Sequence, residues 1–213
     1  MKNITALCVA FTLILLSCKD NATEKKADAS MNSSSNKSEM QDQEWEYLFD
    51  GENMDSWHAF NKDSISSQWQ IEGDALVFTP AENRSGTENL ITNNSYTSFV
   101  LSLDWKISEG GNSGVMWAVQ EQDQYSEPYL TGPEIQVLDN ERHPDAKVNG
   151  KLHQAGALYD MIAPSQNVAN PAGEWNTCEI KIDYAANAGS VTLNGTQIVN
   201  FPVSFLKYYG TQI

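Results

Sequence analysis

The stretch TGPEIQVLDNERHPDAK, from Thr131 to Lys147, holds the pattern that decides both the fold class and the candidate site. A Gly-Pro turn opens it, and five residues of alternating character follow, Glu134 to Leu138. Because residues i and i+2 of a strand share a face, Glu134 and Gln136 point one way, and the apolar residues between them point the other. The pattern predicts a strand with one face in a core and one polar face.

A polar cluster, Asp139 to His143, follows this strand directly. A carboxylate and an amide on a rigid strand, beside a loop with Asp, Arg and His, suit a polyol-binding or catalytic groove. The alternative is an outer strand face with ordinary solvated polar side chains. The strand alone leaves both interpretations open.

The size and charge of the chain narrow the class of protein. Its 213 residues, of which 40% are hydrophobic, suit one domain with a core. The formal net charge of −15 argues against nucleic acid or an anionic membrane surface as an electrostatic partner. The balance favours a neutral partner such as a carbohydrate.

The amino terminus has the organisation of a bacterial lipoprotein. Lys2 precedes an apolar run, Ile4 to Leu16, which has the length of a signal-peptide core and is too short to span a bilayer. The run ends in Ser17-Cys18 and resembles a lipobox, so residues 1–18 are predicted to be a signal peptide with lipidation at Cys18. The lysine after Cys18 favours an outer-membrane lipoprotein that faces the periplasm or the cell surface.

Residues 19–43 are rich in Ser, Asn, Lys, Asp and Glu and have almost no large apolar side chains. Such a segment buries too little surface to offset its ordering entropy, so we predict a disordered tether ahead of a folded domain over residues 44–213. Cys178 is the one cysteine of that domain. It lies in an alternating run and is predicted to be a buried small hydrophobe.

Short strands with turn residues between them recur through the domain. Alternation marks residues 98–107 and 174–184, and hairpins with central glycines are predicted over 69–78 and 191–199. Residues 153–159 read as a further strand or an extended loop. No long stretch has helical periodicity, so the sequence predicts an all-β sandwich.

The groups able to do chemistry gather in the middle third, and they are Asn112, Glu134, Gln136, Asp139, His143, His153, Tyr159 and Asp160. Glu134 and Asp139 stand at i and i+5, so they point to opposite faces of one strand. A retaining-glycosidase pair on this strand is therefore disfavoured, because that mechanism needs two carboxyls ~5 Å apart on one side. Acid–base chemistry with one carboxylate and one histidine fits better.

Each of three candidate residues also has a plainer interpretation. Asp139 stands at a strand end, where Asp commonly caps a loop. His143 precedes a proline and is compatible with a solvated loop residue, and His153 lies in a small, apolar run and is compatible with a core histidine. The sequence does not decide between these interpretations and catalytic ones.

Several motifs resemble the family known as the 3-keto-disaccharide hydrolase domain. They occur in this order: LFDGENMDSW (48–57), NSGVMW (112–117), TGPEIQVLDNERHPDAK (131–147), AGALYDMI (155–162), PAGEWN (171–176) and LNG (193–195). The resemblance implies a concanavalin-like jelly-roll β-sandwich, often found in secreted lipoproteins of carbohydrate-degrading bacteria. The family usually has a closing strand after the LNG hairpin, with no counterpart here before Ile213, so we expect a domain that lacks this strand.

The resemblance also implies a chemistry, the hydrolysis of 3-keto-glycosides. A ketone at C3 acidifies the C2 hydrogen, a base removes it, the enolate expels the C1 aglycone, and water then adds. Glu134 or His153 would be the base, and His143 or Asp139 would assist the leaving group. Sugar hydroxyls would be held by Asn112, Gln136, Tyr159 and Asp160.

No cofactor is certain from the sequence. A divalent cation would stabilise the enolate, but no ligand spacing in the sequence requires one. The competing class is a non-catalytic carbohydrate-binding jelly roll, because many such domains only bind glycans.

Overall fold

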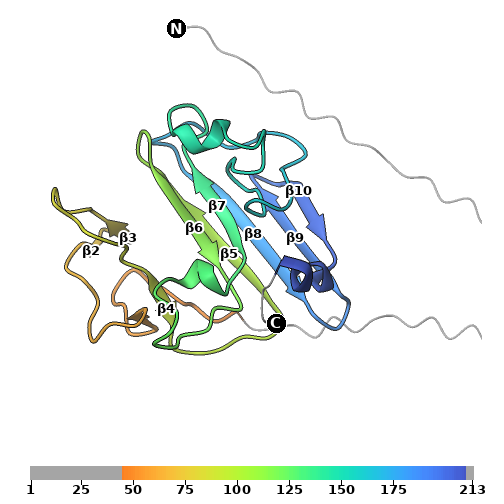
Figure 1. Ribbon diagram of the computed structural model, residues 1–213. Coiled ribbons are helices and arrows are strands. Elements are labelled where there is room, and N and C mark those ends of the chain that lie inside the picture. Colours follow the sequence, from red (N-terminus) through yellow and green to blue (C-terminus); the bar gives the residue numbers. More distant parts are fainter. Residues whose placement is uncertain (1–44, 210–213) are drawn as a thin grey trace, which may run out of the picture. The chain divides into compact units, whose positions relative to one another are not determined.

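The computed structural model describes residues 45–209, and these fold as strands and loops with three short 3-10 helices (Figure 1). The prediction of an all-β sandwich is confirmed. The predicted signal peptide, Cys18 and the tether lie outside the described residues and stay predictions. Within 45–209, no helix is long and apolar enough to cross a membrane.

The main sheet has four antiparallel strands in the order β10-β9-β8-β5. These are β5 (Phe99–Trp105), β8 (Asn176–Asp183), β9 (Ala188–Leu193) and β10 (Thr196–Phe201). Side chains alternate along β8, where Cys178, Ile180 and Ile182 are buried and the residues between them are exposed. Strands predicted over 98–107 and 174–184 are thus confirmed, with Cys178 in the core.

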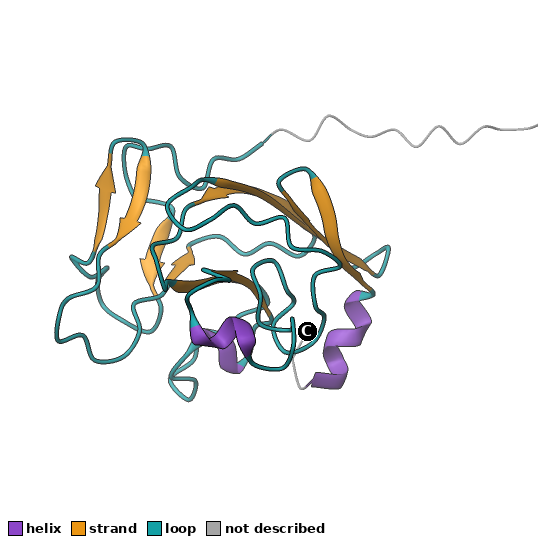
Figure 2. Cartoon of the chain, turned by 90° about the horizontal axis from the view of Figure 1, so that it is seen from above, coloured by secondary structure: helices purple, strands orange, loops and turns teal. Residues whose placement is uncertain are grey.

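A second layer is formed by β6 (Asn112–Met116) and β7 (Glu134–Leu138), which pair antiparallel. Ile135 and Val137 of β7 join the core cluster together with residues of β8, β9 and β10. Figure 2, seen from above, shows the strands in layers joined largely by loops. This packing fixes β7 by its apolar face and thereby directs Glu134 and Gln136 away from the core.

The hairpin between β9 and β10 turns at Asn194-Gly195. Both residues have positive φ, 48° and 77°, as a type I′ turn requires. Asn194 also donates through Nδ2 to the Val168 carbonyl at 2.8 Å, which ties the turn to a neighbouring loop.

The amino-terminal part of the domain contains two small ladders. The strands β1 (Trp57–Ala59) and β4 (Leu90–Thr92) form one, and the predicted hairpin at 69–78 forms the other as β2 (Trp69–Glu72) and β3 (Ala75–Phe78). Every residue of the main core cluster lies at Phe99 or beyond.

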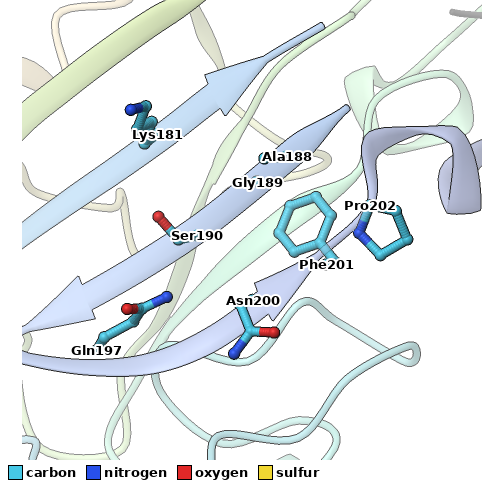
Figure 3. Close-up of a pocket in the computed structure, with 8 residues that line it drawn as sticks. All are labelled: Lys181, Ala188, Gly189, Ser190, Gln197, Asn200, Phe201 and Pro202. Carbon is cyan, nitrogen blue, oxygen red and sulfur yellow. The ribbon is translucent and has the colours of Figure 1, made fainter. Parts of the chain in front are cut away.

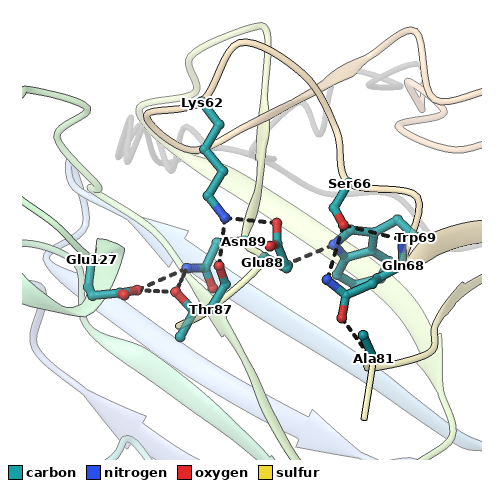
Figure 4. Close-up of polar contacts among 9 residues, drawn as sticks. All are labelled: Lys62, Ser66, Gln68, Trp69, Ala81, Thr87, Glu88, Asn89 and Glu127. Carbon is teal, nitrogen blue, oxygen red and sulfur yellow. Dashed lines mark hydrogen bonds and ion pairs between the residues drawn. The ribbon is translucent and has the colours of Figure 1, made fainter. Parts of the chain in front are cut away.

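Polar side chains connect this amino-terminal part to the loop before β7 (Figure 4). Glu127 accepts hydrogen bonds from the Thr87 hydroxyl and from Asn89 Nδ2, the latter at 3.1 Å. Lys62 pairs with Glu88 at 2.8 Å within the amino-terminal part itself. The attachment between the two parts is therefore strongly polar.

The polar face of β7 is covered rather than solvated. Gln136 is only 2% exposed. Its N–H donates to the Ala157 carbonyl at 3.0 Å, and its carbonyl accepts from the Gly156 N–H at 2.8 Å. Residues 153–159 form turns, with two isolated bridges that both involve Leu158, one to Ile135 and one to Ile162, so this segment is the loop alternative rather than the strand. The interpretation of an ordinary solvated strand face is wrong for β7.

Candidate active site

Glu134 stands at the start of β7, and its carboxyl group lies over Gly114 of β6. A Cβ atom on Gly114 would be 1.8 Å from Glu134 Oε1, so the glycine leaves the space that the carboxyl occupies. The carboxyl group is half-buried and has no hydrogen-bond partner among residues 45–209. Burial, and then the nearby charge of Asp145, raise the pKa of Glu134 to about 7.

His153 is held between two carboxylates. Its Nδ1 lies 2.8 Å from Asp145 Oδ1, and its Nε2 lies 2.6 Å from Asp160 Oδ1. A carboxylate only accepts hydrogen bonds, so this geometry requires a hydrogen on both ring nitrogens. Burial lowers the pKa of His153, but the bonds to Asp160 and Asp145 outweigh it and raise the pKa overall. We assign His153 as an imidazolium at neutral pH.

Tyr159 joins Glu134 to this group. Its ring stacks on His153 with centroids 4.1 Å apart, and its hydroxyl donates to Asp145 Oδ2 at 3.1 Å. Its N–H donates to the Glu134 carbonyl at 2.9 Å. Burial and the bond to Asp145 raise the pKa of Tyr159 to about 12, so the phenol stays protonated. Because β7 fixes Glu134, this backbone bond places Tyr159 beside it.

The short helix η2 (Pro144–Lys147) positions Asp145. Pro144 starts the helix, and His143 caps it, because its Nδ1 accepts from the Asp145 N–H at 3.2 Å. Asp145 was absent from the predicted site residues, yet it bonds to both His153 and Tyr159. We call Glu134, Asp145, His153, Tyr159 and Asp160 the carboxylate–histidine cluster. The structure brings these five together.

Two predicted site residues lie at the other end of β7. Asn112 pairs with Leu138, four residues from Glu134, which corresponds to roughly 13 Å along a strand. Asp139 follows Leu138 and is 3% exposed. Its carboxylate accepts from the N–H groups of Gly110, Glu141 and Arg142, the first of which is the largest influence lowering its pKa. Asp139 thus has the capping role that the sequence allowed, and neither residue belongs to the cluster.

Gln136 and His143 are the remaining two predicted site residues, and they lie between Glu134 and Asp145 in the sequence. The Gln136 amide is buried, and its Oε1 accepts from the Val137 N–H at 3.2 Å, so the described structure offers it no open face toward a sugar. The His143 ring uses Nδ1 to cap η2, and its Nε2 has no partner among the described residues. His143 therefore lies two residues from Asp145 with one nitrogen unused.

No group of three or more His, Cys, Asp or Glu side chains in residues 45–209 is arranged to hold a metal ion. Both nitrogens of His153 are already bonded to carboxylates. Glu134 is the one carboxyl of the cluster without a hydrogen-bond partner among the described residues.

Replacing Gly114 with Ala is expected to displace the Glu134 carboxyl. The new methyl group would overlap Oε1, and a flexible side chain moves more readily than a strand. A displacement of this size costs up to ~100-fold in rate where a reacting group must be aligned. Turnover and urea unfolding should be measured together, with Ser113→Ala on the neighbouring, exposed position of β6 as the control. Full activity in the Gly114→Ala protein would contradict the placement of Glu134 as a reacting group.

The raised pKa of Glu134 should destabilise the fold as pH rises. The unfolded chain loses this proton near the ordinary value of 4.5, whereas the folded protein keeps it to about 7. Between these two pKa values the folded state binds more protons than the unfolded state, so the free energy of unfolding falls as pH rises. The fall is complete once the pH is above both pKa values. Glu134→Gln lacks this loss, so its advantage over the parent should grow by about 2 kcal/mol from about pH 5 to about pH 8. Urea unfolding at both pH values measures it, and an advantage that shrinks with pH would contradict the assignment.

Comparisons with known proteins agree with this fold. The profile of the 3-keto-alpha-glucoside-1,2-lyase-like domain matches residues 44–209. A 3-keto-disaccharide hydrolase of Bacteroides thetaiotaomicron is 36% identical over 149 residues, which are 63% of this chain and 51% of that protein. The chain thus spans about half the length of this curated relative.

Two solved structures share the architecture. The crystal structure of a proposed glycosyl hydrolase from Parabacteroides distasonis ATCC 8503 has a TM-score of 0.68 and 28% identity, and the match covers 78% of this chain and 77% of that one. A second such protein from the same organism has a TM-score of 0.50 at 22% identity, over 72% and 63% of the two chains, which shows the fold alone. Since the family profile covers most of the sequence, the chain belongs to the family of 3-keto-alpha-glucoside-1,2-lyase-like domains.

Proposed function

We propose that this domain hydrolyses 3-keto-glycosides, with Glu134 as the base that removes the C2 proton. One observation carries the assignment. The Glu134 carboxyl is half-buried, has no partner among the described residues, and has a pKa raised to about 7. A general base works best when its pKa lies near the operating pH and its oxygen is free to accept. The similarity to a 3-keto-disaccharide hydrolase supports the substrate class.

The proposed reaction balances in three steps. Ionised Glu134 takes the proton from C2, and the electron pair of that C–H bond forms the C2–C3 double bond of an enolate. The enolate then expels the aglycone, so the C1–O bond breaks and the carbon–carbon double bond moves to C1–C2. Water adds its hydroxyl group to C1, and protonated Glu134 returns a proton to C2. The proton that this water loses balances the one that the leaving aglycone oxygen takes up. The net change is hydrolysis, and the ketone is regenerated.

His153 serves this scheme as a fixed positive charge rather than as the base. Both of its nitrogens are bonded to carboxylates and the side chain is 5% exposed, so no lone pair is free for a substrate proton. The imidazolium holds Asp145 and Tyr159 in place, and its charge offsets part of the negative charge of Asp145, which otherwise opposes the ionisation of Glu134. Of the two bases considered from the sequence, the geometry favours Glu134.

His143 is the proposed hydrogen-bond donor to the oxygen of the leaving group. Its Nε2 is the ring nitrogen without a partner in the described structure, and the other nitrogen is fixed by the Asp145 N–H. Asp139 is less suited, because three backbone N–H groups hold its carboxylate ionised. Asp160 and Tyr159 are proposed to contact sugar hydroxyls, and Asp160 is well exposed for this purpose.

The activity should rise with pH through about 7. Glu134 must be ionised to act, and its pKa is raised to about that value. On the alkaline side the rate should fall where the His153 imidazolium, whose pKa is also raised, loses its proton. A profile of kcat/KM against pH measures both limits. An acidic limb near the ordinary pKa of glutamate would contradict the role of Glu134.

Purified protein should be incubated with 3-keto-trehalose, 3-keto-lactose and their unoxidised parents, with and without added divalent metal. Release of sugar from the keto forms alone would support the proposal. Exchange of the C2 hydrogen with deuterated water, measured by NMR, would report proton removal separately from cleavage. A folded protein that releases no sugar and shows no exchange would overturn it, and binding of the unoxidised parents would then favour the non-catalytic carbohydrate-binding alternative.

A further inference from the structure

The outer face of the four-stranded sheet has a hollow that the proposed reaction does not use. Its volume is about 370 Å³, and its lining is drawn in Figure 3: Lys181, Ala188, Gly189, Ser190, Gln197, Asn200, Phe201 and Pro202. None of these belongs to the carboxylate–histidine cluster. They come from β8, β9, β10 and the residue after β10.

The strand register places three polar side chains in one row across this face. Ser190 of β9 pairs with Lys181 of β8 on one side and with Asn200 of β10 on the other. Directly paired residues of neighbouring strands have Cβ atoms roughly 5 Å apart. Gln197 adds a second carboxamide from the next row along β10, where it pairs with Thr192. The sheet thus presents an ammonium, a hydroxyl and two carboxamides at fixed spacing.

These four side chains are free to bind a ligand. Lys181, Ser190, Gln197 and Asn200 make no side-chain hydrogen bond or ion pair within residues 45–209. Together they offer both donors and acceptors, since each carboxamide carries an NH₂ and a carbonyl and the hydroxyl does both. A sugar hydroxyl is likewise donor and acceptor, so the set is suited to a polyol.

The remaining lining residues give the hollow its depth and an apolar border. Ala188, which lies on the same face of β9 as Ser190, has a small side chain and so lowers the surface beside it. Pro202, which is exposed, borders the hollow with apolar atoms, whereas the Phe201 ring packs in the core against Gly189. A pyranose has apolar C–H faces as well as hydroxyls, and ligand sites commonly combine apolar walls with a few polar groups.

The charges of the hollow and of the whole chain favour a neutral ligand. No carboxylate lines the hollow, and Lys181 adds a positive charge, so the lining disfavours a bound cation. The chain carries a net charge of −15, which repels an anionic glycan at long range. We propose that this hollow, formed by β8, β9 and β10, is a second glycan-binding site, which holds a neutral oligosaccharide without the need for a 3-keto group.

The two sites can be tested separately by NMR. Isotope-labelled protein should be titrated with maltotetraose, cellotetraose and laminaritetraose, none of which carries a ketone at C3. At least one of them should shift the amide signals of β8, β9 and β10 in a saturable manner, and Glu134→Gln should leave its affinity unchanged. The double variant Gln197→Ala/Asn200→Ala should bind at least ~10-fold more weakly, because two hydrogen-bonding side chains are removed. It should keep the activity on keto sugars.

Thr177→Ala is the matched control, because Thr177 is an exposed residue of β8 on the same sheet but outside the hollow. This variant should bind as the parent does. The proposal is overturned if none of the three sugars shifts these signals, if the shifts map to the cluster around Glu134 instead, or if only an oligosaccharide of uronic acids binds. Unchanged affinity in the double variant would also overturn it.

Discussion

Glu134→Gln is expected to lower kcat on a 3-keto disaccharide by at least ~100-fold, the usual contribution of a positioned general base. The substitution keeps the shape of the side chain and removes only its ability to accept a proton. Because the carboxyl makes no hydrogen bond within the described residues, no internal network is broken. KM should therefore change little, and the fold should be retained. Steady-state kinetics near pH 8, where the parent residue is ionised, measure the effect.

Glu141→Gln is the control for this experiment. Glu141 lies on the same stretch of sequence, but its side chain is 69% exposed and, in the part of the chain that the structure describes, pairs with Arg142 alone at 3.5 Å. It should retain the activity of the parent. If the Glu134→Gln protein exchanges the C2 hydrogen at the rate of the parent, Glu134 is not the base, whatever its effect on cleavage.

His153→Gln is expected to reduce both activity and stability. The change removes the positive charge between Asp145 and Asp160 and the ring that stacks on Tyr159. Loss of hydrogen bonds to charged groups at a buried position costs about 2–3 kcal/mol. Because Asp145 and Tyr159 lose their fixed positions as well, kcat should fall by at least ~100-fold. The stabilising contribution of His153 is present at low pH and is lost as pH rises through its raised pKa, so the two proteins should differ least in stability at high pH.

His58→Gln provides a matched control for His153. His58 also contacts a carboxylate, Glu121 at 2.8 Å, and an amide oxygen of Asn93, but its side chain is 40% exposed. Exposed pairs of this kind contribute roughly 0–1 kcal/mol, so His58→Gln should be nearly neutral in stability and in kcat. Equal losses in the two variants would indicate a general effect of removing a histidine, and near-normal turnover of His153→Gln would exclude His153 from the mechanism.

The sequence predicted the strands well, because their side chains alternate between a core and an outer face. In β8, for example, Cys178, Ile180 and Ile182 are buried and the residues between them are exposed. The same reasoning failed on the polar side of β7. Local alternation separates the two faces of a strand, but it carries no information on a loop that later folds over one of them. Gln136 is 2% exposed, and its backbone pairs with Gly156 and Ala157, some twenty positions away.

The candidate site was predictable in part, from residue type. Glu134, His153, Tyr159 and Asp160 stood out by residue type, and the structure brings them together. Asp145 did not, because its importance depends on a turn of 3-10 helix that directs it back to His153, eight residues later. The one local signal was an acidic residue directly after Pro144, at a helix start. Asp139 stands between a strand end and a loop, where a cap is expected. In the structure its carboxylate accepts backbone N–H groups of the adjoining loops, as a cap does.

The polar attachment of the amino-terminal ladders has a consequence for the way this domain opens. Residues before Phe99 contribute nothing to the main core cluster, and the loop at 121–127 binds them through Glu121 and Glu127. A unit held by hydrogen bonds in contact with water separates at a lower free energy than the packed sheets and exchanges its amide hydrogens first. Since that loop leads directly into Thr131 and β7, local opening of the amino-terminal unit would loosen one border of β7 while the hydrophobic core stays closed.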